Sequence, residues 1–124
     1  MAKRILYKNH CTPQEQVSSG GRYYLDSDCG RKLAGSNLYE LGSDTTATGT
    51  LTATGDLGSD SGFDFIAVTA TSITSGTVLL SLDDGTTQIM QLIEGECFAS
   101  KIASGAQPVV AISGTATVDY MTGT

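Results

Sequence analysis

An alternation of apolar and polar residues is the clearest pattern in the chain, and it is strongest between residues 63 and 102. Val78, Leu80 and Leu82 occupy every second position there. Because the side chains of a β-strand point alternately to its two faces, this spacing predicts a strand with one core-facing row. An Asp-Gly pair at 84–85 follows directly. It predicts a tight hairpin, since glycine accepts a positive φ and aspartate tolerates it.

The same spacing predicts further strands before and after this one. Threonine, valine and isoleucine are abundant in them, and these β-branched residues fit a pleated sheet better than a helix. Turn signals, among them Ser75-Gly76 and Ser113-Gly114, recur about every ten residues, as in all-β sandwiches and barrels. We therefore predict an all-β fold, an antiparallel sandwich or barrel of about seven strands. The expected strands cover residues 45–54, 63–71, 78–83, 86–93, 97–102, 108–112 and 115–121. The residues expected on the core side include Val78, Leu80, Leu82, Phe98, Ile102, Ala116, Val118 and Tyr120. In the strand expected over residues 86–93, Met90 and Leu92 share one face and Ile89 and Ile93 the other, and either face could be buried.

Residues 1–44 lack a sustained alternation, and several glycines interrupt any helical spacing. We predict an irregular extended N-terminal arm over residues 1–44, followed by the β-sandwich or barrel domain over residues 45–124. Four of the five tyrosines lie in the arm. Tyrosine buries a large ring, keeps a polar hydroxyl and is common at interfaces. Two interpretations stay open: the arm lies over a neighbouring subunit, or it wraps its own domain.

The charge is unevenly distributed along the 124 residues, whose net charge is −6. Residues 1–33 hold six basic and three acidic side chains, whereas residues 34–124 hold one basic and ten acidic side chains. A basic arm on an acidic body predicts contact with an acidic surface, such as the body of another subunit; the alternative is a solvated tail. Nucleic acid is not an expected partner, because the basic residues are dispersed and the acidic body would repel phosphate.

The candidate partner-binding residues are the basic and tyrosine side chains of the arm. They are Lys3, Arg4, Tyr7, Lys8, Arg22, Tyr23, Tyr24, Arg31, Lys32 and Tyr39. The first ten residues carry no apolar run of signal-peptide length, and no segment is long and apolar enough to span a membrane. We therefore expect synthesis in a cytoplasm and no membrane partner.

Catalytic chemistry is not expected. Catalysis needs a positioned base, usually together with a nucleophile or a metal. The single histidine, His10, stands beside Cys11, and the side chains of sequence neighbours diverge in an extended chain. No glycine-rich loop follows a strand and opens a helix, so no phosphate-binding motif is recognised. We predict no enzyme activity, no catalytic residue and no cofactor.

Metal binding is a less favoured alternative for two groups of residues. Cys11, Cys29 and Cys97 lack the paired spacing of zinc ligands, and we expect free thiols in a reducing compartment. A Cys11–Cys29 disulfide in a released particle and a zinc site that includes His10 are the alternatives. The aspartates of the 55–64 segment recur every fourth residue, which matches no calcium-loop geometry. A solvated loop is therefore favoured there.

Four segments follow one another in a recognisable order. They are Gly62–Val68 (GFDFIAV), Gly76–Gly85 (GTVLLSLDDG), Leu92–Glu96 (LIEGE) and Ser113–Tyr120 (SGTATVDY). They would form a strand, an Asp-Gly hairpin, a Gly-Glu turn and a final strand. With this series of elements, residues 62–122 resemble small structural proteins of tailed bacteriophage particles. The resemblance implies a capsid decoration (cement) protein, which binds the outside of a capsid lattice and stabilises it. It implies as partners the major capsid protein or other virion subunits and further copies of the chain, and as location the virion surface after synthesis in the host cytoplasm.

Two other roles stay open. A tail, neck or fibre-attachment component would use the same kind of body at another place on the virion. A module that binds host glycan belongs to a different class. Sugars often stack on exposed tryptophan, and the chain has none.

Overall fold

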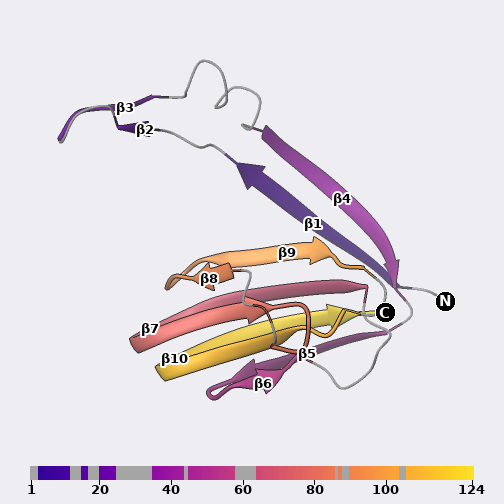
Figure 1. The fold of residues 1–124 in the computed structure, drawn as a ribbon. Coiled ribbons are helices and arrows are strands. Elements are labelled where there is room, and N and C mark those ends of the chain that lie inside the picture. Colours follow the sequence, from indigo (N-terminus) through magenta and orange to yellow (C-terminus); the bar gives the residue numbers. More distant parts are fainter. Residues whose placement is uncertain are drawn as a thin grey trace. The chain divides into compact units, whose positions relative to one another are not determined.

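The computed structural model describes residues 3–11, 15–16, 20–24, 35–43, 45–57, 64–85, 87, 90–103 and 106–124. The regular elements of these residues are strands (Figure 1), and the predicted all-β class is therefore confirmed. The strands are β1 (Lys3–Cys11), β2 (Glu15–Gln16), β3 (Tyr23–Tyr24), β4 (Gly35–Ser43), β5 (Thr46–Leu51), β6 (Gly55–Asp56), β7 (Phe65–Ser81), β8 (Met90–Leu92), β9 (Cys97–Lys101) and β10 (Val109–Gly123).

The chain divides into two compact units. We call Leu6–Glu40 the ribbon, and Met1–Ile5 together with Leu41–Thr124 the body. Within the ribbon's strands, β1 pairs with β4 and β2 pairs antiparallel with β3. The first residues of β1 and the last residues of β4 belong to the body, which therefore includes residues that precede and follow the ribbon in the sequence.

The described part of residues 1–44 is not irregular, which corrects the expected irregular arm. Its strands pair with each other, and the rings of Tyr7 in β1 and Tyr39 in β4 stack with centroids 5.3 Å apart. The alternation is difficult to recognise in the sequence because Ile5 and Tyr7 share their strand with Lys8 and other charged residues. Cross-strand aromatic contacts stabilise a two-stranded sheet that has little apolar surface to bury.

The body is built on two long antiparallel strands, β7 and β10, which pair along nearly their whole length. On its other side, β10 pairs with β5 and β6, and β7 pairs with β9 and β8. Both long strands bend sharply near their middle (Figure 1). The first layer holds β5, β9 and residues 116–123 and 65–72 of the long strands, and the second layer holds β6, β8 and their other halves.

The bend lies where two glycines face each other across the strands. Gly76 is paired with Gly114, and their φ angles are +79° and +89°. The register also shifts between Thr115 and Ala116 and again between Thr117 and Val118. Such β-bulges kink and twist a strand without ending its pairing. We expected the two Ser-Gly pairs to be turns between separate strands. Instead, each continuous strand passes through its Ser-Gly pair, because two facing glycines allow the backbone to fold over while the strands remain paired.

The core fills the space between the layers and draws on both halves of β7 and β10. The buried cluster consists of Leu57, Ile66, Val68, Ala70, Val78, Leu80, Leu92, Ile102, Val110, Ala116 and Val118. Leu82, Met90, Phe98 and Tyr120 are partly buried and pack against it. All eight residues predicted on the core side are therefore in the core or packed on it, and of the two possible faces of β8 the one with Met90 and Leu92 packs on the core. A smaller buried group contains Ile5 and Phe65 beside Gly123.

The loop after β7 is organised by Asp83. Its Oδ1 accepts hydrogen bonds from the backbone N–H of Thr87 and from the hydroxyl of Ser81, both at 2.8 Å. These donors, the Thr87 N–H foremost, lower the pKa of Asp83 below its ordinary value. Asp84 and Gly85 have the expected positive φ angles, +59° and +78°. The predicted tight hairpin is nevertheless wrong, because the pairing of β7 with β8 ends at Leu80 and Met90 and leaves a longer connection between them.

Replacing Asp83 with asparagine is expected to lower the melting temperature at neutral pH but not in strong acid. A lowered pKa means that the ionised carboxylate stabilises the folded state above the ordinary aspartate pKa of about 3.9. This contribution is lost as the pH falls through the lower pKa of the folded protein. Melting curves of both proteins should therefore converge in acid. Asp84→Asn is the control, since the Asp84 carboxylate makes no hydrogen bond within the described part of the chain. A pH-independent difference for Asp83→Asn would contradict the prediction.

Candidate functional site

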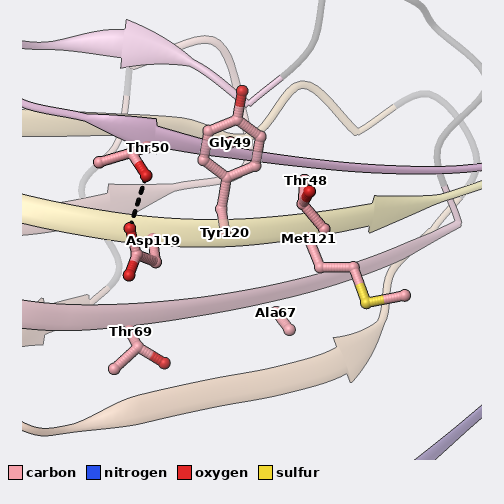
Figure 2. A pocket seen from close by; sticks show the side chains of 8 residues that line it. All are labelled: Thr48, Gly49, Thr50, Ala67, Thr69, Asp119, Tyr120 and Met121. Carbon is pink, nitrogen blue, oxygen red and sulfur yellow. Dashed lines mark hydrogen bonds between the residues drawn. The ribbon is translucent and has the colours of Figure 1, made fainter.

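A shallow hollow of about 430 Å³ opens on the outer face of the first layer, where β5, β10 and β7 run side by side (Figure 2). Cross-strand partners of a sheet share a face, and two rows of partners cross this hollow. The rows are Thr50, Asp119 and Thr69, and then Thr48, Met121 and Ala67. Hydroxyl, methyl and thioether groups thus surround a single carboxylate, because the alternation of each strand sends its apolar residues to the core and these residues outward.

The polar groups of the hollow are only partly used. The hydroxyl of Thr50 donates a hydrogen bond of 2.7 Å to Oδ1 of Asp119, which fixes the carboxylate against β5 (Figure 2). Within the described part of the chain, Oδ2 of Asp119 and the hydroxyls of Thr48 and Thr69 make no hydrogen bond. The hollow can therefore accept and donate hydrogen bonds to a polar ligand, and its described lining includes no nucleophile next to a base.

Gly49 and Tyr120 complete the lining. They are cross-strand partners, and a Cβ at residue 49 would overlap the Tyr120 hydroxyl and lie 2.6 Å from its ring carbon Cζ. The glycine therefore gives the ring room to lie across β5 (Figure 2). Tyr120 is half-buried and packs against the core from the inner side.

The ribbon carries the other candidate site. Of the residues predicted to bind a partner, Tyr7 is half-buried in its stack with Tyr39, which is 41% exposed, and Lys8 and Arg22 are exposed. Arg4 is exposed in β1, where the chain still belongs to the body. Among these residues, the structure brings the rings of Tyr7 and Tyr39 into contact with each other.

The remaining predicted residues stay untested. Lys3 lies in β1, and Tyr23 and Tyr24 form β3, but their side chains lie outside what the structure describes. Arg31 and Lys32 lie outside the described residues. Two further side chains of the ribbon, Leu6 and Leu38, are 65% and 66% exposed and were not among the predicted partner-binding residues. These two leucines can be recognised as candidates for partner binding only once the pairing of β1 with β4 shows that their side chains are exposed.

The charge contrast between arm and body depends on where the chain is divided. The ribbon, residues 6–40, holds four basic and four acidic side chains and has no net charge. The body holds three basic and nine acidic side chains, a net charge of −6. The body is acidic as expected, whereas the ribbon carries no net charge that would attract an acidic surface.

The metal alternatives receive no support from the described residues. Among them, no group of three or more His, Cys, Asp or Glu side chains is close enough to hold a metal ion. Cys97 is exposed in β9 and is not in a disulfide. The side chain of Cys11 is not described, and Cys29 and Asp60 lie outside the described residues, so the disulfide, zinc and calcium alternatives that involve them stay open.

The sequence contained a partial signal for the hollow. Small residues alternate from Thr45 to Thr54, which predicted a strand there, and Asp119 alternates with the core-side residues Val118 and Tyr120 of another predicted strand. That these two strands are neighbours follows only from the tertiary pairing.

A search of the described residues found no helix with the length and apolar character needed to cross a membrane. Comparisons with models of protein families, with curated proteins and with solved structures gave no match to this chain.

Proposed function

We propose that this chain is a structural virion protein that binds the outside of a bacteriophage capsid lattice and stabilises it. The proposal rests on the resemblance of residues 62–122 to small phage structural proteins, and on one observation in the ribbon. The major capsid protein, or another virion subunit, is the proposed partner, and the virion surface is the proposed location.

The observation that carries the proposal is the exposure of large apolar side chains on the ribbon. Leu6, Leu38 and Tyr39 are 65%, 66% and 41% exposed. Three of the four large apolar side chains that are exposed in the described structure therefore lie in this one small unit. Aromatic and apolar side chains at the centre of an interface supply most of its binding energy. A neutral ribbon with such side chains is suited to contact a neighbouring protein.

The two-unit organisation fits a protein that needs contacts and no chemistry. A compact body can remain folded while an attached ribbon reaches a neighbouring subunit. On a repeating lattice, many weak contacts add up to tight retention, because each bound copy or contact raises the effective concentration of the next.

Replacing Leu6 and Leu38 together with serine is expected to weaken binding to phage particles assembled without the protein by at least about tenfold, or about 1.4 kcal/mol. Both side chains are mostly exposed, so the substitutions should leave the fold intact. Ile93→Ser is the matched control, because Ile93 is 62% exposed but lies on the body. Co-sedimentation with the particles measures the binding. Equal loss for the control, or no loss for the double variant, would contradict a role for the ribbon.

The number of copies on each particle separates the shell from the tail. Occupancy in the hundreds fits a capsid lattice, whereas a handful of copies fits a tail, neck or fibre-attachment component. Quantitative mass spectrometry of purified particles gives this number directly.

The hollow on the first layer favours host glycan as a second candidate ligand. The hydroxyls of Thr48 and Thr69 and the carboxylate of Asp119 match the hydrogen-bonding groups of a sugar, and Met121 offers an apolar surface. A glycan array tests this candidate without any phage particle.

A further inference from the structure

Within the residues that the structure describes, the outer edge of β5 carries unpaired backbone groups and no protecting feature. Within the described part of the chain, β5 pairs with β10 alone and ends the path of the sheet. Its sequence, TATGTL, contains no charged residue and no proline, and its pairing with β10 runs without a register shift. Natural proteins normally protect an open sheet edge with a lysine, a proline or a bulge. β5 has none of these features, which indicates that its outer edge pairs with a further strand.

The hydrogen-bonding pattern shows which residues face outward. The N–H of Thr124 donates to the carbonyl of Thr45 at 3.0 Å, and these residues continue the regular register of β5 with β10. In an antiparallel pair, alternate residues direct both backbone groups to the same neighbour. The odd-numbered residues of β5 therefore bond to β10, and Thr46, Thr48 and Thr50 direct their N–H and C=O groups to the free edge.

We propose that this edge pairs with the same edge of a second copy, antiparallel and around a twofold axis at Thr48. In this register, Thr48 faces Thr48 of the partner subunit, and Thr46 faces Thr50 of the partner subunit. Each facing pair exchanges two hydrogen bonds, so all three outward residues are satisfied on both copies. The first layers of the two bodies then form one continuous sheet.

A second copy fits this edge because the edge is self-complementary. Its outward residues are all threonine and are spaced symmetrically about Thr48. A twofold interface requires such symmetry, since the same patch meets itself. Facing threonines on one side of a sheet also favour pairing, because β-branched side chains pack well there and their hydroxyls can bond to each other.

The acidic charge of the body does not prevent this contact. Asp119 is the charged residue opposite Thr50, one strand away from the edge. In the proposed register the two Asp119 carboxylates are about 20 Å apart, from a rise of about 3.4 Å for each residue and a strand spacing of about 4.8 Å. That separation is more than twice the screening length of about 8 Å at physiological salt.

The opposite edge of the first layer is different. There the N–H of Ile102 donates to Asp64, so the even-numbered residues of β9 bond to β7 and the odd-numbered ones face outward. Ala99 and Lys101 are among them, and an exposed lysine is a common device against edge pairing. This difference singles out β5. The inference concerns contact between copies, and it is independent of what the ribbon binds.

Sedimentation equilibrium of the full chain over a wide concentration range, without any phage component, tests the proposal. A dimer is expected, and Thr48→Pro should weaken it at least about tenfold, because proline removes the outward N–H at the twofold axis from both copies. That N–H makes no bond to β10, so the body should still fold. Ala99→Pro is the matched control: it removes an outward N–H from the other edge and should leave the dimer unchanged.

Hydrogen exchange of the unmodified protein gives a second readout that does not depend on a variant. The amides of Thr46, Thr48 and Thr50 should exchange slowly in the dimer and rapidly on dilution. A monomer at all concentrations, a dimer that Thr48→Pro leaves intact, or rapid exchange of these three amides in the dimer would each overturn the proposal. None of these results would bear on capsid binding by the ribbon, which the leucine variants test separately.

Discussion

Replacing Gly76 with alanine is expected to abolish the native fold of the body. A Cβ at residue 76 would overlap the backbone carbonyl of Ser113 on the facing strand, and Gly76 has a φ of +79° that side chains disfavour. The obstacle is backbone rather than a flexible side chain, so β7 and β10 would have to separate at their bend. Because the two layers are continuous through that bend, we expect a loss of more than about 4 kcal/mol, a size reserved for strained or overpacked sites.

Gly95→Ala is the matched control for this prediction. Gly95 has a similar φ of +82°, but nothing lies within 4 Å of a Cβ built there. The Gly95→Ala variant should lose only about 1–2 kcal/mol of unfolding free energy, which is the cost of a left-handed backbone conformation for a residue with a side chain. Chemical denaturation of both variants measures the difference. Similar losses at the two glycines would mean that the close approach of Gly76 to Ser113 does not exist.

Replacing Leu80 with alanine is expected to cost about 3 kcal/mol of unfolding free energy. Leu80 is fully buried in the cluster between the two layers, and truncating a buried leucine removes apolar contacts and leaves a cavity. The preceding residue provides the control, because Leu79 points to the other face of β7 and is only half-buried. Leu79→Ala should cost clearly less. A larger loss at Leu79 would show that the face assignment of β7 is inverted.

The sequence was a reliable guide to which side chains face the core. Val78, Leu80 and Val118 were predicted there from their alternation and are fully buried. Alternation is a local property: once a segment is extended, neighbouring side chains point to opposite faces whatever the strand pairs with. Burial of one face then follows from the composition of that face.

The sequence was a poor guide to where strands end. Ser75-Gly76 and Ser113-Gly114 were interpreted as turns, yet β7 continues through the first pair and β10 through the second. A glycine with a positive φ occurs in turns and in bends alike. A bend differs from a turn here because Gly76 lies opposite Gly114 on the neighbouring strand, and these two residues are far apart in the sequence.

The candidate sites follow the same division. The tyrosines of the ribbon were identifiable from composition, but the stacking of Tyr7 on Tyr39 requires the pairing of β1 with β4. The hollow was not predicted, because Thr50, Asp119 and Thr69 come from three strands that are distant in the sequence.

By itself, the sequence determined that this protein is all-β, which residues face its core and that its body is acidic. These properties depend on single residues and on spacing within one strand. Only the tertiary structure decided that β5 ends the described sheet, that one face of the sheet is hollowed, and that the N-terminal segment forms a paired ribbon. Those features arise from hydrogen bonds and contacts between segments far apart in the chain. The same alternating pattern is compatible with many strand orders, and packing selects one of them.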